Sequence, residues 1–316
     1  RRARKSRRGS NAFMTATTLL AIDWGTTSAR AYRVGMAGAV LEQRSAALGV
    51  QNVQDGRFAE ATVALLGDWR NDDAPCIACG MVGSRQGWCE APYIDCPAPL
   101  AALAGGIVTA PGDGLAIVPG VRTRDHNGMP DVIRGEETQL AGAVEDTDES
   151  VLAVLPGTHS KWARVERGQL VDFSTYMTGE LFGVLLAHTI LGRLAQPPGQ
   201  VTGPGFERGV ARGLGAGALN HDLFGARTLA LMGELAAEDV ADWLSGLLIG
   251  REVRNARAWA QRAGLDGACV RLIGSDALVP RYRLALAQAD IAVELGPDNA
   301  AAIGLWRIAR AAGIVH

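Results

Sequence analysis

Several features that mark other classes of protein are missing from this sequence of 316 residues. No run of eighteen apolar residues occurs, so we expect no segment to span a membrane. The formal net charge is only -2, which gives no reason to expect nucleic acid as a partner. The Walker motif Gly-x-x-x-x-Gly-Lys-Ser/Thr is absent, which argues against a P-loop enzyme. No Gly-x-Ser-x-Gly elbow supports a serine hydrolase.

Cysteine is also scarce, with five residues in the chain. An odd number without a clear secretory signal argues against a disulfide framework and favours a cytoplasmic protein. Cys76 and Cys79 have the spacing of a zinc-binding pair. However, the segment 75–79 is typical of a buried strand, in which positions three apart face opposite sides. We therefore expect no zinc site there.

The segment 1–13 differs from the rest, because it carries six basic residues and no acidic one. We interpret it as a disordered extension or tag, with a cationic targeting peptide as the alternative. The remaining chain, 48% hydrophobic, is long enough for two domains. We expect an N-terminal lobe over 14–145 and a C-terminal lobe over 146–316.

Predicted strands and helices alternate along the chain, which indicates an α/β fold. Forty glycines recur in short clusters, as expected where loops approach a ligand with bare backbone. Strands are predicted over 18–22, 29–34, 75–78, 115–118, 151–155, 163–166, 270–273 and 291–294. Helices are predicted over 58–69, 136–144, 179–194, 237–263 and 280–289.

A short internal sequence repeat suggests that the two halves share one architecture. The segments 20–28 and 152–160 align, and Leu, Ala, Gly, Thr and Ser coincide. Each reads as a strand, a Gly-Thr tip and a return strand. Two matched hairpins, one near the start of each half, are what a duplicated two-lobed fold needs, and we expect them to face each other across a cleft.

Such tips suit phosphate binding, because they offer backbone N–H groups and hydroxyls without a bulky side chain. Asp23 ends the first strand and can hold Mg²⁺ through water, since protein-bound magnesium usually keeps several waters. Arg30 and Lys161 can add positive charge, and His159 can donate to a phosphate oxygen. The other residues of the predicted phosphate sites are Gly25, Thr26, Thr27, Gly157, Thr158 and Ser160.

These segments resemble the motifs of the actin-and-hexokinase superfamily. Segments 23–28 and 157–160 resemble its two phosphate motifs. Segment 270–275, which contains Gly274 and Ser275, resembles its adenosine motif. Segment 298–304 resembles the small-residue helix that follows. The resemblance implies a two-lobed, ribonuclease H-like fold with a nucleotide cleft between the lobes, and a kinase that uses ATP and Mg²⁺.

A finer resemblance is to the family of 2-dehydro-3-deoxygalactonokinases, from about residue 17 to the C-terminus. It implies ATP-dependent phosphorylation of the 6-hydroxyl of 2-dehydro-3-deoxy-D-galactonate, in galactonate breakdown. The stretches that carry it are Gly-Met-Val-Gly-Ser-Arg-Gln-Gly-Trp at 80–88, Arg-Gly-Glu-Glu-Thr-Gln at 134–139, Pro-Gly-Thr-His-Ser-Lys-Trp at 156–162, Met-Thr-Gly-Glu-Leu at 177–181 and Ser-Gly-Leu-Leu-Ile-Gly at 245–250.

The catalytic base is expected among carboxylates, because the attacking hydroxyl must lose its proton. Glu136 and Glu137 begin a predicted helix where related sugar kinases place an acid. Adjacent helical residues point about 100° apart, so only one should face the substrate. We favour Glu137, while Asp125 or Asp131 stays open. Both glutamates could instead only favour the helix dipole.

The substrate that the resemblance implies is an anion with several hydroxyls, so its pocket should hold a cation and small polar residues. The loop after the strand at 75–78 offers Gly83, Ser84, Arg85 and Trp88. Arg134 is a second cation for the carboxylate, since guanidinium binds carboxylates bidentately. Each arginine could equally be a solvated surface charge, and Trp88 a packing residue.

Two other functions stay open on the sequence. The acidic helix start also resembles that of exopolyphosphatases, so a phosphatase or polyphosphate hydrolase of the same fold is one alternative. A non-catalytic sugar-acid sensor is another, although no helix-turn-helix segment is evident. The sequence leaves open the oligomeric state, a homodimer included, and physics alone does not separate the galactonate-derived acid from its gluconate-derived epimer.

Overall fold

The structure, a computed structural model, describes residues 16–145, 150–196, 203–274 and 277–316. The predicted extension at 1–13 therefore lies outside the described residues. By their contacts, the residues form two compact units. The first unit comprises the chain up to Ser150, with Val165–Asp172 and Asn299–His316; the second comprises Val151–Arg164 and Phe173–Asp298. A single boundary after residue 145 does not describe this division, because two later segments return to the first unit.

The main sheet of the first unit has the order β3-β2-β1-β4-β8-β7. Its central strand β1 pairs antiparallel with β2 and parallel with β4. The strands are β1 (Leu19–Trp24), β2 (Ala29–Val34), β3 (Val40–Ala46), β4 (Cys76–Gly80), β7 (Val108–Thr109) and β8 (Ala116–Ile117). The predicted hairpin and the strand after it are confirmed.

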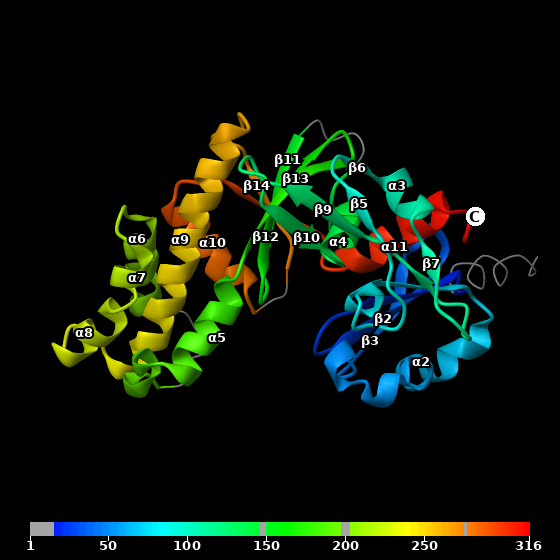
Figure 1. Cartoon of the computed structure of the whole chain (residues 1–316), viewed down its shortest axis with the longest axis horizontal. Helices are drawn as coiled ribbons and strands as arrows, with labels where there is room; N and C mark the ends of the chain where they lie inside the picture. Colours follow the sequence, from blue (N-terminus) through cyan, green and yellow to red (C-terminus); the bar gives the residue numbers. More distant parts are fainter. Residues whose placement is uncertain (1–15, 146–149, 197–202, 275–276) are drawn as a thin grey trace, which may run out of the picture. The chain divides into compact units, whose positions relative to one another are not determined.

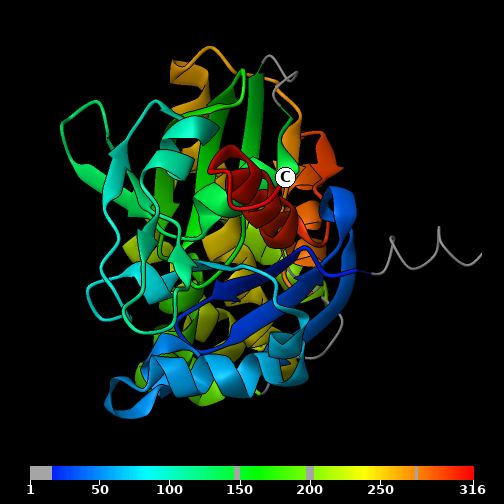
Figure 2. The ribbon, with the colours of Figure 1, turned by 90° about the vertical axis from the view of Figure 1, so that its right-hand side faces the viewer.

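Helices cover both faces of this sheet, which explains why β1 is apolar along most of its length. Helix α2 (Phe58–Leu66) packs on one face, where Leu20, Ile22 and Trp24 join Phe58 in one core cluster. Helix α11 (Ala300–Ala311) contacts β1 and β4, and Figure 2 shows the blue strands between these two helices. A strand buried on both faces loses the alternation of apolar and polar residues.

Helix α4 (Glu136–Ala143) lies against α11 with almost no side chain between them. A Cβ on Gly142 would lie 1.9 Å from the carbonyl oxygen of Ala300, and one on Gly304 would lie 1.8 Å from that of Thr138. Only glycine permits this approach, because any side chain would overlap the opposite backbone. The small residues of α11 thus fix the position of α4 in the first unit.

A second, three-stranded sheet of the first unit has the order β10-β9-β5. It consists of β5 (Tyr93–Asp95), β9 (Gly120–Arg124) and β10 (Pro130–Ile133). Strand β6 (Ala98–Pro99) leads into α3 (Leu100–Gly105) and pairs with β13 at Gln169 and Leu170.

The third sheet has the order β15-β14-β11-β12-β13-β6, and its five strands β13-β12-β11-β14-β15 repeat the order β3-β2-β1-β4-β8 of the first sheet. Leu20 in β1 lies opposite Cys76 in β4, and its equivalent Leu152 in β11 lies opposite Val270 in β14. The internal repeat at 20–28 and 152–160 therefore corresponds to equivalent strands in equivalent registers. The strands are β11 (Ser150–Leu155), β12 (Ser160–Glu166), β13 (Gln169–Tyr176), β14 (Val270–Leu272) and β15 (Val293–Leu295).

Helices make up most of the rest of the second unit. Helix α6 lies along α9 (Figure 1), and glycines again allow backbone contact: a Cβ on Gly209 would lie 2.1 Å from the carbonyl oxygen of Trp243. The helices are α5 (Thr178–His188), α6 (Pro204–Leu214), α7 (Leu219–Asp222), α8 (Gly225–Leu231), α9 (Val240–Arg262) and α10 (Val279–Gln288). Short 3-10 turns lie at Met36–Gly38, Val50–Asn52, Gln54–Gly56, Gly67–Asp72, Met81–Gly83, Ile190–Leu194 and Ala237–Asp239.

In the part of the chain that the structure describes, no helix is both long enough and apolar enough to cross a bilayer.

Candidate active site

Asp23 lies near the end of β1, opposite Arg30 in β2 and Cys79 in β4. Burial raises its pKa to about 6; the charge of Arg30 lowers the pKa, and that of Glu136 raises it further. Hydrogen bonds from the side chains of Gln139 and Cys79 also favour the ionised form. The end of β1 and the first turns of α4 therefore meet at this carboxyl group, which a cation would stabilise.

The tip of the first hairpin is held by the turn at Val50–Asn52. The backbone N–H groups of Val50 and Gln51 donate to the carbonyl oxygens of Gly25 and Thr26, both at 3.0 Å. A Cβ on Gly49 would lie 2.2 Å from the carbonyl carbon of Thr27. Gly49, which the sequence did not single out, is therefore needed for this turn to approach the tip.

The side chains of the predicted first phosphate site differ in exposure. Thr26 and Thr27 are exposed at the tip, and Arg30 is exposed on β2. Gly25 closes the turn, because its N–H donates to the carbonyl oxygen of Ser28 at 2.9 Å. The two threonine hydroxyls and the guanidinium are thus accessible from solvent on the same hairpin as Asp23.

Glycine backbone contact places the first turn of α4 beside the end of β4. Gly135 has a φ of 112° and Gly80 a φ of 91°, both in the region that favours glycine. A Cβ on Gly135 would lie 3.2 Å from the Cα of Gly80. The partly buried Glu136, the next residue, accepts a hydrogen bond from the N–H of Arg134 at 3.1 Å. Its charge acts on Asp23, as the pKa of that residue shows.

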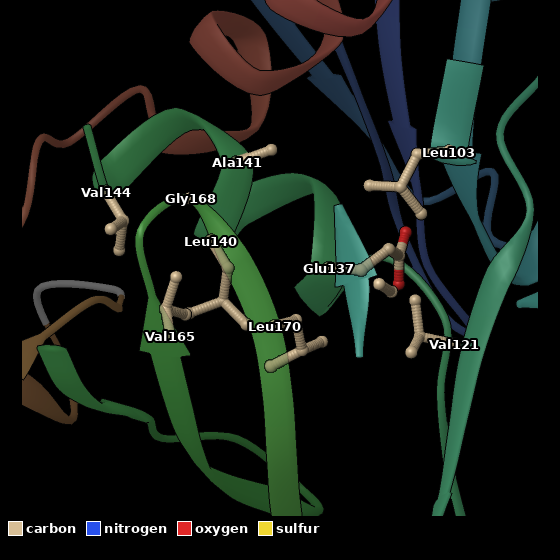
Figure 3. Close-up of a pocket in the computed structure, with 10 residues that line it drawn as sticks. Leu103, Val121, Glu137, Leu140, Ala141, Val144, Val165, Gly168 and Leu170 are labelled. Atoms are coloured by element: carbon tan, nitrogen blue, oxygen red, sulfur yellow. The ribbon is translucent and has the colours of Figure 1, made fainter. Parts of the chain in front are cut away.

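Glu137 points the other way, into the interior of the first unit. Its side chain reaches a cavity of about 30 Å³, and Figure 3 shows the carboxyl group between Leu103 and Val121. It accepts hydrogen bonds from the N–H of Gly135 at 2.7 Å and from Thr138 Oγ1 at 2.9 Å. Only 2% of Glu137 is exposed, and burial together with the charge of Glu136 raises its pKa to about 7.

The other carboxylates left open as the base lie in the hairpin of β9 and β10. Asp125 Oδ1 accepts hydrogen bonds from the N–H groups of Asn127 and Met129, at 2.8 and 2.9 Å. Asp131 Oδ1 accepts one from the N–H of Val132 at 2.8 Å. Both carboxylates therefore bond to the backbone of their own hairpin.

Arg134 is a buried cation with unused hydrogen-bonding capacity. Its guanidinium lies over the ring of Tyr93, 4.3 Å from the centroid, and Nη2 donates to the carbonyl oxygen of Ala91 at 2.9 Å. Nε and Nη1 have no partner, although Arg134 is only 9% exposed. Ser84 Oγ is also buried without a partner. Unsatisfied buried donors are rare in proteins, so these two groups call for a partner such as a water, an ion or a ligand.

The loop over 81–91 brings further predicted substrate residues near this cation. A Cβ on Gly83 would lie 3.0 Å from Nη1 of Arg134, so glycine leaves room for the guanidinium. Arg85 is 87% exposed and lies 3.6 Å from Glu90. Trp88 stacks on Phe58 with 6.0 Å between the ring centroids. Trp88 thus packs against the core, and the Arg85 side chain is open to solvent; their predicted contact with the substrate stays a prediction.

The second hairpin tip is held by the start of α5. The N–H of Glu180 donates to the carbonyl oxygen of Thr158 at 3.0 Å, and the Glu180 carboxylate pairs with the imidazole of His159. A Cβ on Gly179 would lie 2.6 Å from the carbonyl oxygen of Gly157. Thr158 and His159 are exposed at this tip.

Two residues predicted to bind phosphate point into the second unit instead. Ser160 is fully buried, and its hydroxyl donates to the Glu252 carboxylate at 2.7 Å. Lys161 is 7% exposed, and its ammonium group donates to the carbonyl oxygen of His159 at 2.8 Å. Both hold the tip from behind rather than reaching solvent, because the residues after the tip already belong to the buried strand β12.

A pocket of about 180 Å³ opens beside this tip within the second unit. Its lining is mostly apolar, with a glycine of the tip at one side. The lining residues include Gly157, Thr178, Gly179, Ser245, Leu248 and Tyr282. Gly274, two residues after β14, lies by Pro156, where a Cβ would be 3.3 Å from the proline ring. Ser275 lies outside the described residues.

Several residues of both sites carried no sequence motif. Gly49, Tyr93 and Glu252 are isolated in the chain and reach the sites only through tertiary contacts. For Glu252, an acid shortly after the apolar run 247–249 was the available signal, because a buried charge needs partners. Among the described residues, no three His, Cys, Asp or Glu side chains form a group that could hold a metal ion by themselves.

Comparison with known proteins gives consistent matches over most of the chain. A model of the 2-keto-3-deoxy-galactonokinase family matches residues 23–308. The 2-dehydro-3-deoxygalactonokinase of Escherichia coli (strain K12) is 37% identical over 294 residues, which cover 92% of this chain and 97% of the relative.

Solved structures give the same picture. A crystal structure assigned to a 2-dehydro-3-deoxygalactonokinase from Sinorhizobium meliloti has a TM-score of 0.81 and 38% identity, covering 93% of this chain and 98% of that one. An activator of 2-hydroxyisocaproyl-CoA dehydratase from Clostridium difficile has a TM-score of 0.50 at 12% identity, covering 93% and 95%, and bears on the fold alone. The predicted actin/hexokinase-like α/β fold is confirmed.

Proposed function

Because this chain belongs to the 2-keto-3-deoxy-galactonokinase family, we propose that it transfers the γ-phosphoryl group of ATP to the 6-hydroxyl of 2-dehydro-3-deoxy-D-galactonate. In this step the hydroxyl oxygen forms a bond to the γ-phosphorus, and the bond from that phosphorus to the β–γ bridging oxygen breaks. ADP leaves, and the hydroxyl proton passes to a carboxylate. Such a reaction asks the protein mainly for positioning and charge stabilisation.

The observation that carries this proposal is the pair of partnerless donors, Nε and Nη1, on the buried guanidinium of Arg134. These two donors lie on different edges of the guanidinium, so each can give a carboxylate one charge-assisted hydrogen bond. The unsatisfied hydroxyl of Ser84 offers another hydrogen bond in the same loop region. A sugar acid supplies the anion that this part of the first unit lacks. We therefore assign carboxylate binding to Arg134 and Ser84, and no longer to Arg85 or Trp88.

Glu136 is the base in this proposal, in place of the Glu137 favoured on the sequence. Glu136 is partly exposed and its charge acts on Asp23, so its carboxylate lies on the side of α4 where phosphate chemistry is proposed. Glu137 is buried and already accepts two hydrogen bonds within α4 and its first turn. A general base must reach the proton that it abstracts, which a carboxyl group enclosed by leucine and valine cannot do.

Asp23 would hold Mg²⁺, with the charge of Glu136 nearby. Magnesium usually binds one or two protein carboxylates and completes its shell with water and substrate phosphates. The donor set around Asp23 fits that pattern, since burial and Glu136 both disfavour an uncompensated carboxylate there. The ion, when bound, neutralises charge on the phosphate oxygens. Thr26, Thr27 and Arg30 would add donors from the same hairpin.

The pocket of the second unit would receive the nucleotide. Its apolar walls suit an adenine ring, and Gly157 at its side lets phosphates approach the backbone of the tip. Thr158 and His159 are the exposed side chains that could donate to phosphate oxygens. Gly274 leaves space where β14 ends beside the tip.

The direct test is an assay that couples ADP formation to a visible signal, with both 2-dehydro-3-deoxy epimers as acceptors. We expect ATP consumption that depends on the galactonate-derived acid and on Mg²⁺. Phosphate release without an acceptor would instead identify a hydrolase. We further propose that the enzyme acts in the cytoplasm, where ATP is available; a homodimer stays a prediction that sedimentation analysis would test.

A further inference from the structure

One buried carboxylate in α9 gathers more hydrogen bonds than the proposed reaction explains. Glu252 is 2% exposed. Its Oε1 accepts hydrogen bonds from Ser160 Oγ at 2.7 Å and from Trp162 Nε1 at 2.8 Å. Its Oε2 accepts them from Tyr282 OH at 2.8 Å and from the hydroxyl of Thr178. An ionised carboxylate has about four acceptor sites, so the four donors fill them.

These donors come from three elements, two of which line the proposed nucleotide pocket. Ser160 and Trp162 are in β12, directly after the second tip. Thr178 begins α5, and Tyr282 is in α10; both line the pocket. Burial raises the pKa of Glu252 and its hydrogen bonds lower it, so the network is what allows a charge to remain inside the second unit.

Glu252 holds both of the segments that meet at the second hairpin tip. One segment is the start of α5, where Gly179 contacts the backbone of Gly157 in the tip. Ser160 anchors the chain on the other side of His159. Glu252 therefore accepts hydrogen bonds from Thr178, directly before the contact in α5, and from Ser160, directly after the tip.

We propose that Glu252 is a positioning residue for nucleotide binding, which sets the tip 157–159 against the start of α5 and the wall formed by Tyr282. This inference rests on the proposed function, because it takes the pocket of the second unit to be the nucleotide site. Glu252 itself does not reach the pocket surface, so it acts through Ser160, Thr178 and Tyr282. Donors that are already held in place strengthen binding, because the ligand does not have to supply the free energy of ordering them.

The substitution Glu252→Gln keeps the size and shape of the side chain and removes its charge. Trp162 Nε1 can only donate, so the amide oxygen of glutamine must face Trp162 and Ser160. The amide nitrogen then faces Thr178 and Tyr282, whose hydroxyls must turn round to accept. We expect Glu252→Gln to fold and to raise the KM for ATP about tenfold, with the KM for the sugar acid within about twofold of wild type.

Ser160→Ala gives a second, milder variant. The Ser160 side chain is fully buried, so it cannot touch the nucleotide, and its hydroxyl donates to Glu252. A rise of about threefold to tenfold in the KM for ATP is expected from loss of one hydrogen bond to a charged group.

Asp222→Asn is the matched control, because Asp222 is equally buried and pairs with Arg212 and Arg251, outside the nucleotide pocket. It should lower the melting temperature and leave the KM for ATP unchanged.

Titration with a non-hydrolysable ATP analogue, by calorimetry on the full chain, tests the role of Glu252 separately from the proposed function. Tight binding by wild type and weaker binding by Glu252→Gln and Ser160→Ala, but not by Asp222→Asn, supports the inference. Wild-type binding with unchanged affinity in Glu252→Gln and Ser160→Ala overturns it and leaves the proposed function standing. Absence of nucleotide binding by folded wild type overturns both.

Discussion

Asp23 at the end of β1 and Glu136 at the start of α4 act on each other, because the charge of Glu136 raises the pKa of Asp23. They are far apart in sequence and are joined by the contact of Gly80 with Gly135. Two carboxylates near one point repel each other unless a cation binds. The pairing supports the proposal that a divalent ion binds at Asp23 with Glu136 as the base beside it.

The two adjacent glutamates should respond differently to the same substitution. We expect Glu136→Gln to lower kcat by about 10² to 10⁴, the usual contribution of a general base. Glu137→Gln should change kcat by less than about tenfold, since its carboxyl group is enclosed in the cavity of Figure 3. Steady-state assays of both variants decide the matter. A large loss in Glu137→Gln with an active Glu136→Gln would reverse the assignment.

Glu137 should also make stability depend on pH. Its pKa is about 7 in the folded protein against 4.5 as the ordinary value, so the folded state keeps the proton longer than the unfolded state. The contribution of Glu137 to the free energy of unfolding is therefore fully present below pH 4.5. It is lost as the pH rises through 7, and the total loss is about 3 kcal/mol.

Glu137→Gln removes that dependence, because an amide does not titrate. Urea unfolding at pH 5 and at pH 8 should show the variant gaining stability relative to wild type at pH 8. An equal difference from wild type at both pH values would contradict the raised pKa of Glu137.

Arg134 and Arg85 provide a test of carboxylate recognition. Arg134→Gln should raise the KM for the sugar acid about tenfold to a hundredfold, through loss of hydrogen bonds between charged groups. Arg85→Gln, which replaces a side chain that is 87% exposed, should stay within about twofold of wild type. The KM for ATP serves as the internal reference in both variants. The reverse ranking would return the carboxylate to the loop residue Arg85.

The contact between α4 and α11 predicts a strong effect of one methyl group. Gly304→Ala places a Cβ 1.8 Å from the carbonyl oxygen of Thr138, so the helices must separate. We expect a loss of about 3 kcal/mol in stability and a lower kcat, because α4 carries Glu136. Gly183→Ala is the control: it lies within α5, and a Cβ there meets nothing within 4 Å. That variant should gain up to about 1 kcal/mol in thermal or urea unfolding. Similar destabilisation of both would show that helix propensity, and not the crossing, decides.

Strands and helices with strong local patterns were predictable from the sequence, and their ends were not. The predicted helix over 58–69 ends as an α-helix at Leu66 and continues as a 3-10 turn. The one predicted over 179–194 ends at His188. Helix α6 (Pro204–Leu214) was missed, because its glycines lower helix propensity while they permit contact with α9.

The sequence by itself determined the repeated strand–tip–strand pattern, the family and the set of polar residues at the two tips, because local motifs encode turns and strand ends. Tertiary structure decided which of those side chains face solvent. Glu137, Ser160 and Lys161 turn inward, since neighbouring residues on a helix or strand point to different sides and only packing fixes which side is buried. Glu252 and Gly49 join the sites through contacts between distant segments, which spacing in one sequence does not reveal.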